Sequence, residues 1–367
     1  MPVLMPLALF AGHPAPPPHT RTYYVAADEV VWNYVPQGKN VITGMAFDSV
    51  ERPFVTAGPN WIGGVAKKAI YREYTDSTFM TLKPRAPGDE YLGFLGPLMR
   101  AVVGDTIRVF FRNNTAFPVG MHPHGVFYRK DSEGAPYTDG TSGEDKADDA
   151  VPPGGRHTYL WPVPERAGPA SGDGSSVAWM YHSHVHDEGD ISTGLMGPIV
   201  ITARGKAKAD GTPMDVDREF VVMFYEVDEN TSSYLDQNLA TYKTDTGAVH
   251  VGFTFGLPEA GGGAFQFNTK ETLNGFMYGN GPMPTMKVGN RVRWYLMAAT
   301  GFEFHSPHWH GNTVEIAHMR TDVGALLPMG MVTADMVPDN PGIWLFHCHV
   351  SPHLRMGMQM RYQVTSR

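Results

Sequence analysis

The chain is patterned as short apolar runs separated by turn residues. Between clusters of Gly, Pro, Asn and Asp, stretches such as residues 106–111 and 291–297 carry β-branched and aromatic side chains. Few segments place apolar residues at the three- and four-residue spacing of an amphipathic helix. The pattern therefore predicts an all-β protein built from β-sandwiches.

The same order of motifs occurs twice along the chain. Each half has a strand that begins Val-Gly, then a His-x-His-Gly motif, then a Trp-x-x-His-x-His motif. These motifs stand at residues 103–109, 122–125 and 179–184 in the first half, and at residues 288–294, 308–311 and 344–349 in the second. Such a repeat predicts a duplicated sandwich, with an insertion in a loop of the first copy.

We therefore predict two domains, at residues 22–203 and 216–367. The segment 204–215 between them is polar, small and turn-prone, as a linker is. Residues 1–21 are predicted to be an N-terminal arm or the remnant of a leader. Residues 1–15 are apolar but lack the basic start of a secretory signal, so both interpretations stay open.

Composition narrows the possible partners. The formal net charge of −8 and a pI near 6.0 argue against nucleic acid or an anionic membrane as the partner. No apolar run is long enough to span a bilayer. Cys348 is the single cysteine, so the chain has no internal disulfide.

Histidines carry the strongest chemical signal. Ten of the 16 lie in four clusters: His122 and His124; His182 and His184; His305, His308 and His310; His347, His349 and His353. Side chains two residues apart share one face of a strand, so each His-x-His pair presents two imidazoles together. One such pair is as often chance as a metal site, but four pairs matched across a duplication are not accidental. Eight imidazoles exceed the needs of one zinc ion and suit several copper ions.

Cys348 completes the pattern because it stands between two histidines. Alternation places its thiolate on one face of the strand and the flanking imidazoles on the other. His305 and His353 join Cys348 as the His₂Cys set of a blue copper, with Met358 as the weak axial ligand. The other interpretation of Met358 is core filler, as for its neighbours Met356 and Met360.

With these motifs the sequence resembles the multicopper oxidases, most closely the ceruloplasmin and hephaestin branch. The segments 23–32, 71–76 and 190–198 are also similar to that branch. The resemblance implies two cupredoxin-like Greek-key β-sandwich domains and four copper ions per chain. It implies these roles: type 1 copper on His305, Cys348, His353 and Met358; type 2 copper on His122 and His308; type 3 coppers on His124, His182, His184, His310, His347 and His349.

The first half departs from the blue-copper pattern. Val119, Ser183, Glu188 and Thr193 stand where the four type 1 ligands would be, so only the second domain is expected to hold a type 1 copper.

Other features of the family are matched in part. The iron ligands of ceruloplasmin fall on Gln266, Glu271 and Pro352, of which only Glu271 could bind iron. Asp148 and Asp149 resemble a calcium-binding pair, against the alternative of a solvated acidic turn.

The implied reaction couples one-electron oxidation of a small reducing substrate to four-electron reduction of O₂ to water. Electrons are expected to pass through Cys348 and then His347 or His349. Asp139 is the predicted proton relay, with a turn residue as the alternative. Because the cluster needs histidines from a first and a second domain, the resemblance further implies a homotrimer with clusters between subunits.

The substrate is predicted to be a laccase-like phenol or aromatic amine, with Fe(II) or Cu(I) also considered. Met319, Met329, Met331 and Met336 suggest Cu(I), although most methionines fill cores. Rival functions are a copper nitrite reductase and a non-catalytic copper-binding protein. Ser183 opposes the first, because the blue-site cysteine of such reductases lies in domain 1, and the complete ligand set opposes the second. Relatives imply a periplasmic or secreted protein.

Overall fold

A computed structural model describes residues 18–244, 266–301 and 304–366. The first half contains β1 (Thr20–Asn33), α1 (Arg52–Val55), β2 (Val65–Tyr74), η1 (Glu90–Leu92), β3 (Met99–Val102), β4 (Thr106–Asn113), β5 (His122–Pro123), η2 (Lys130–Ser132), η3 (Gly143–Lys146), β6 (Arg156–Pro162), η4 (Glu165–Ala167), β7 (Ser176–His182), α2 (Asp187–Thr193) and β8 (Met196–Thr202). The second half contains β9 (Arg218–Asp228), α3 (Leu235–Tyr242), β10 (Thr269–Leu273), β11 (Thr285–Lys287), β12 (Val292–Ala298), β13 (Pro307–Trp309), β14 (Val314–Ile316), β15 (Met319–Thr321), β16 (Met331–Met336), β17 (Gly342–Cys348), α5 (Ser351–Met356) and β18 (Gln359–Thr365).

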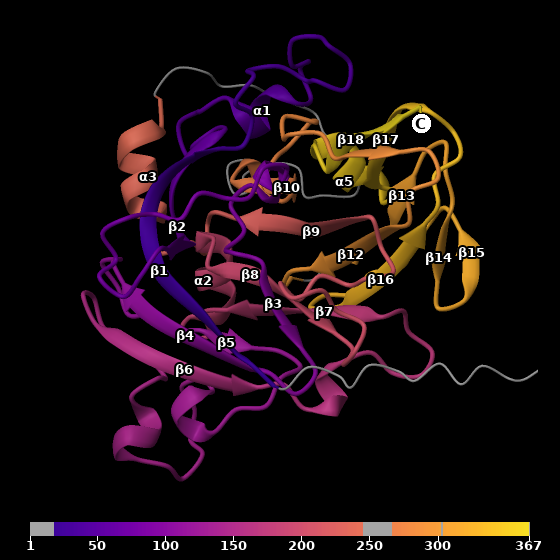
Figure 1. The fold of residues 1–367 in the computed structure, drawn as a ribbon. Coiled ribbons are helices and arrows are strands. Elements are labelled where there is room, and N and C mark those ends of the chain that lie inside the picture. The colour runs from indigo at the N-terminus through magenta and orange to yellow at the C-terminus, as the bar shows by residue number, and fades with distance from the viewer. Residues whose placement is uncertain (1–17, 245–265, 302–303, 367) are drawn as a thin grey trace, which may run out of the picture.

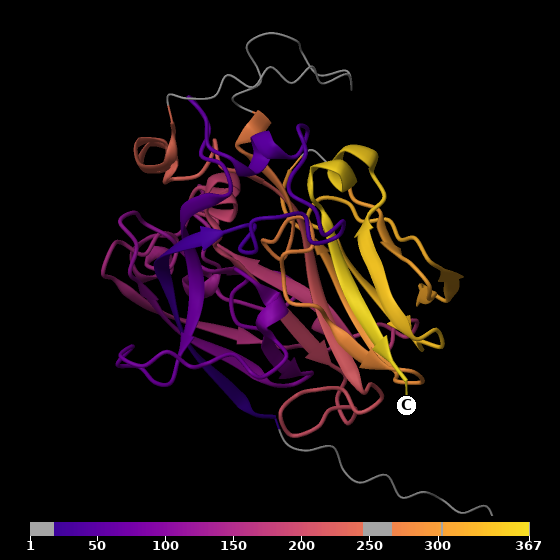
Figure 2. The ribbon, with the colours of Figure 1, turned by 90° about the horizontal axis from the view of Figure 1, so that it is seen from above.

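The two halves repeat one strand order. Sheets β2-β1-β4-β6 and β3-β8-β7-β5 in the first half correspond to β10-β9-β12-β16, extended by β14 and β15, and β11-β18-β17-β13 in the second. The strand directions repeat as well, since β1 and β4 are parallel like β9 and β12. The two sandwiches lie side by side, indigo to magenta and orange to yellow (Figure 1, Figure 2). The predicted all-β duplication is therefore confirmed.

The burial of side chains along a strand shows whether one or both of its faces are covered. In β4 every second residue is buried, as expected for a strand with one face on the core. By contrast, β8 and β12 are buried along their whole length. One hydrophobic core contains Met180 and Val200 from the first half together with Trp294 and Leu296 from the second. The sandwiches thus share apolar packing.

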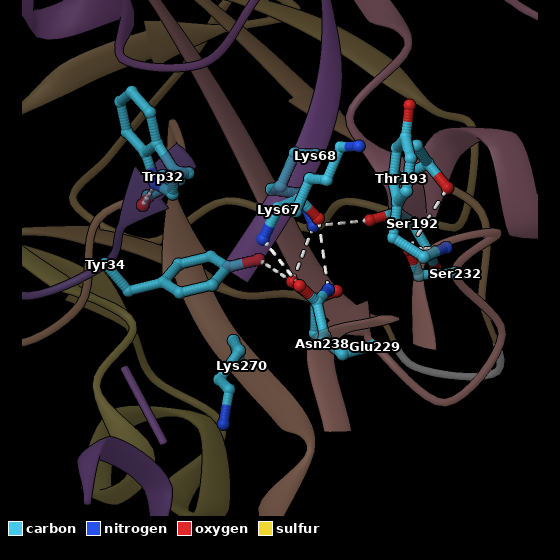
Figure 3. A network of polar contacts seen from close by, with 12 residues as sticks. Trp32, Tyr34, Lys67, Lys68, Ser192, Thr193, Glu229, Ser232, Asn238 and Lys270 are labelled. Carbon is cyan, nitrogen blue, oxygen red and sulfur yellow. Dashed lines mark hydrogen bonds and ion pairs between the residues drawn. The ribbon is translucent and has the colours of Figure 1, made fainter. Parts of the chain in front are cut away.

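A buried polar network also joins the halves (Figure 3). Lys68 Nζ on β2 lies 2.6 Å from Glu229 Oε1, just after β9, and donates to the carbonyl of Ser192 at 2.7 Å. Tyr34 donates to the same carboxylate. Lys68 and Glu229 are fully buried, so breaking this pair would leave an uncompensated charge in the interior.

The predicted domain limits stay a proposal. Strand β1 begins at Thr20, two residues before the predicted start of domain 1, and most of the predicted arm at residues 1–21 lies outside the described residues. Residues 204–215 lie between β8 and β9 and contain a bridge between Ala207 and Pro213. Within the described ranges, no helix is long and apolar enough to cross a membrane.

Candidate metal centre

The second sandwich brings His305, Cys348 and His353 together from three places. Cys348 ends β17, His353 lies in α5, and His305 precedes β13. The Nδ1 atoms of His305 and His353 are 3.2 Å apart, and Cys348 Sγ lies 4.0 and 3.5 Å from them. All three side chains are buried. One thiol and two imidazole nitrogens at this spacing form a trigonal metal-ligand set.

Backbone contacts hold the sulfur of this set in place. The N–H of Ser306 donates to Cys348 Sγ at 3.3 Å, and the N–H of Cys348 donates to the carbonyl of Met358 at 3.1 Å. Met358 is fully buried beside the set and belongs to the same hydrophobic core as Met356 and Met360. Hydrogen bonds to a ligating sulfur are among the means by which a protein tunes a copper site.

Four histidines of the second sandwich form a quartet next to that set: His308, His310, His347 and His349. Their ring centroids are 4.8 to 5.4 Å apart. The register of β13 and β17 places His308 opposite His347 and Pro307 opposite Cys348. The Nε2 atoms of His310 and His347 lie 3.1 Å apart. The sequence interpretation of the alternating strand therefore matches the arrangement, with imidazoles on one face and the thiol on the other.

The first sandwich carries a matching quartet: His122, His124, His182 and His184. The ring centroids are 5.2 to 5.6 Å apart. The register of β5 and β7 places His122 opposite His182, and the Nε2 atoms of His124 and His182 lie 3.1 Å apart.

Backbone carbonyls fix the tautomer of four quartet histidines. The Nδ1 atoms lie 2.7 to 3.0 Å from carbonyl oxygens, in the pairs His122 with Glu133, His182 with Ser183, His308 with Asp322 and His347 with Cys348. A carbonyl oxygen only accepts, so Nδ1 carries the hydrogen and Nε2 keeps its lone pair. Burial lowers the pKa of His124 and His347 to about 4 and of His182 to about 3. These rings are therefore neutral near pH 7, the form that binds metals.

Within one chain the two quartets lie apart from each other. None of the ring contacts or hydrogen bonds of the described residues joins one quartet to the other. His310 and His349 are exposed, and His122 and His124 line a hollow of about 370 Å³ together with Phe127, Tyr128 and Arg166. Each quartet thus faces outward.

The first sandwich fills its equivalent of the thiol set with other contacts. Ser183 and Thr193 are fully buried, Val119 is part of the core, and Glu188 is exposed. The hydroxyl of Ser183 donates to Asp190 at 2.6 Å and accepts the N–H of Gly120 at 3.1 Å. The hydrogen bonds of Ser183 therefore stand, in the first sandwich, where the second sandwich has its thiol set.

Asp139, predicted as a proton relay, and the suggested calcium pair lie in the region between η2 and β6. Asp139 contacts Lys130 and Lys146 at 3.0 and 2.9 Å and accepts two hydrogen bonds from Thr141, which lower its pKa. This arrangement is that of an ion-paired turn. Asp149 of the suggested calcium pair lies 3.1 Å from Lys146, while the buried Asp148 accepts the N–H of Gly134.

Sequence reasoning missed Glu226. It lies on β9 directly opposite Glu271 on β10, and ligand atoms of Glu226, Glu271 and His353 lie within 4.8 Å of one another. A charged residue within the apolar run of β9 was the available signal. The other expected iron positions, Gln266 and Pro352, offer no carboxylate.

Comparison with known proteins gives consistent matches. Two family models described as multicopper oxidase match residues 92–206 and 257–367. The ferroxidase HEPHL1 of Homo sapiens is 46% identical over 350 residues, which cover 94% of this chain and 29% of that protein. Hephaestin of Homo sapiens is 43% identical over 95% of this chain and 29% of its own length. Ceruloplasmin of Mus musculus is 38% identical over 94% of this chain and 32% of its own length. The chain therefore spans about a third or less of the length of these relatives.

Solved structures show the same fold at low identity. The multicopper oxidase mgLAC aligns over 94% of this chain and 86% of its own, with a TM-score of 0.57 and 16% identity. The blue copper oxidase from Nitrosomonas europaea aligns over the same shares, with a TM-score of 0.54 and 17% identity. The expected cupredoxin-like sandwiches are thereby confirmed.

Proposed function

Because the chain belongs to the multicopper oxidase family, we propose that it oxidises a reducing substrate in one-electron steps and reduces O₂ to water. The observation that carries this proposal is the combination of one buried His₂Cys set and two histidine quartets. Copper, when bound, supplies the one-electron transfer and the oxygen chemistry.

The donor atoms fit copper of three kinds. His305, Cys348 and His353, with Met358 as axial ligand, would hold the type 1 ion. Close Nε2 pairs suit one metal each, so His124 with His182 and His310 with His347 would each hold a type 3 copper. His184 and His349 would complete these two sites, and His122 with His308 would hold the type 2 ion. This gives four copper ions per chain.

The chain itself links the two kinds of site. Cys348 is covalently continuous with His347 and His349, so a short backbone path joins the thiolate to two quartet imidazoles. The neutral imidazoles need no proton loss before they bind metal.

Assembly follows from the outward-facing half-sites. A complete cluster needs one quartet of each kind, and two different surfaces that meet head to tail close into a ring. Arg166 beside the first quartet and the half-exposed Asp322 beside the second offer opposite charges across such a contact. We propose that this ring is a homotrimer with a cluster at each interface.

For the reducing substrate, Fe(II) is favoured by Glu226 and Glu271. Glu226 and Glu271 lie directly opposite each other in the sheet, so both carboxylates would be ligands of a divalent cation bound between them. Two carboxylates suit Fe(II), and they lie beside His353 of the proposed type 1 set, whereas Cu(I) prefers thioethers. The methionines suggested for Cu(I) are scattered, with Met319 exposed and Met336 buried. A phenol needs access to a site whose imidazoles are almost fully buried.

Substitution of the acid pair tests this choice. In Glu226→Gln and Glu271→Gln we expect the KM for Fe(II) to rise at least about tenfold, while turnover with a phenol stays unchanged. Glu315→Gln, an exposed glutamate on β14, is the matched control. An equal loss with both donors, or no loss with Fe(II), would contradict iron as the substrate.

Two rival functions have distinct outcomes. Nitrite reduction by the purified protein at a rate above that of O₂ uptake would favour a copper nitrite reductase. Full copper loading without O₂ uptake would favour a copper carrier.

Two further proposals follow the resemblance. We place the protein in the periplasm or outside the cell, which cell fractionation tests. Calcium binding at Asp148 and Asp149 is tested by a Ca²⁺-dependent rise in Tm. A calcium ion there would have to compete with the ammonium of Lys146, which lies beside Asp149.

A further inference from the structure

We propose that Asp148 tunes His122 as a copper ligand through the peptide group that joins Glu133 to Gly134. This inference rests on the proposed assignment of His122 to the type 2 copper. Asp148 is then a positioning residue, because it acts on the metal through another side chain.

The contacts form one continuous chain. The Nδ1–H of His122 donates to the carbonyl of Glu133 at 2.7 Å. The N–H of the same peptide group, on Gly134, donates to Asp148 Oδ2 at 2.6 Å. A carboxylate that accepts from a peptide N–H polarises that peptide, so its carbonyl becomes a stronger acceptor. His122 thereby becomes a more basic ligand, as in metal sites where a carboxylate bonds the ligating histidine directly.

Gly134 allows this peptide to lie against His122. Its φ is +71°, and a Cβ there would lie 2.2 Å from the carbonyl oxygen of Met121. Tyr159 ties the same segments together, since its hydroxyl donates to the carbonyl of Asp148 at 3.1 Å and accepts the N–H of Met121 at 3.2 Å. The geometry from carboxylate to imidazole is therefore fixed from two sides.

The burial of Asp148 points to a use for its charge. The residue is fully buried, and Oδ1 has no hydrogen-bond partner among the described residues. A buried carboxylate with so few partners is costly. An asparagine would accept the same N–H from Gly134 while carrying no charge. The hydrogen bond from Gly134 alone therefore does not explain why this position carries a negative charge.

In the second quartet the histidine also contacts a backbone carbonyl, but no carboxylate of the described residues accepts the N–H of that peptide group. His308 Nδ1 lies 2.9 Å from the carbonyl of Asp322, but the next N–H, on Val323, donates to the neutral hydroxyl of Thr321 at 3.1 Å. The two proposed type 2 ligands are therefore inequivalent: a carboxylate acts on His122 through a peptide group, whereas the carboxylate of Asp322 lies 4.0 Å from His308 Nδ1 itself.

Asp148→Asn tests the inference in the copper-loaded protein. We expect type 2 copper to be lost to a chelator about 10- to 100-fold more readily and its electron paramagnetic resonance parameters to shift. The blue absorbance of the type 1 site should be unchanged. Asp145→Asn, an exposed carboxylate in η3, is the matched control for charge, and Tyr159→Phe removes the neighbouring hydrogen bonds while keeping the carboxylate.

The outcomes separate the possible failures. A type 2 spectrum and copper retention like those of the wild type in Asp148→Asn would overturn the inference. An equal effect in Tyr159→Phe, or loss of the blue absorbance in Asp148→Asn, would show a merely structural role and also overturn it. Absence of a type 2 signal in the wild-type protein would instead refute the copper assignment on which the inference rests.

Discussion

At the residue scale, the metal-ligand chemistry depends on strand alternation. His347, Cys348 and His349 direct an imidazole, a thiol and an imidazole to alternate faces. This arrangement was predictable because a strand has a two-residue period that needs no tertiary information. Glu226 was not predictable in the same way, since its partner Glu271 lies far along the chain and meets it only through the register of β9 and β10.

Asp139 gives a prediction at this scale. Asp139→Asn keeps the turn contacts with Thr141 but removes the charge that Lys130 and Lys146 neutralise. If Asp139 relays protons, O₂ reduction slows while the blue absorbance stays intact. Its lowered pKa opposes that role, because a carboxylate that holds a proton weakly is a poor donor near pH 7. Steady-state O₂ uptake by the variant distinguishes the two roles. Turnover equal to that of the wild type would show that Asp139 does not relay protons.

At the scale of elements, the repeated strand order was predictable from the repeated motifs, but the contact between the halves was not. Lys68 and Glu229 have 160 residues between them in sequence, and nothing local marks them as partners. Their burial follows only once β2 and β9 pack together. A buried lysine also makes stability depend on pH, which the sequence alone does not show.

Lys270 provides that pH prediction. Burial lowers its pKa from 10.5 to about 7, with Glu229 raising it and Lys68 lowering it further. Between these values the unfolded chain holds a proton that the folded chain lacks, so this lysine makes stability rise with pH. We expect Lys270→Met to flatten the rise in unfolding free energy between pH 7 and 9, measured by denaturant titration. The exposed Lys206→Met is the control, and an unaltered slope in Lys270→Met would refute the assignment.

At the scale of the whole molecule, the proposed trinuclear cluster needs quartets from two different chains. Each quartet faces outward from its own sandwich, and apolar residues such as Phe127 stand exposed beside it. Exposed apolar and aromatic side chains of this kind are typical of an interaction surface.

Phe127→Asp should therefore disrupt the proposed trimer. We expect monomers in light scattering, loss of O₂ uptake by at least about 100-fold, and retention of the blue absorbance, because the His₂Cys set lies within one chain. Met80→Asp, at a still more exposed position in the loop after β2, should leave the proposed trimer intact. A monomer with full oxidase activity would contradict the shared cluster.

The central claim is that Cys348 serves one copper while its two neighbours serve others. The most direct measurement is copper content, visible absorbance and O₂ uptake of Cys348→Ser beside the wild type. The account predicts four copper ions per chain and a blue colour in the wild type. It predicts three ions, no blue colour and no turnover in the variant. A variant that keeps both colour and turnover would contradict it.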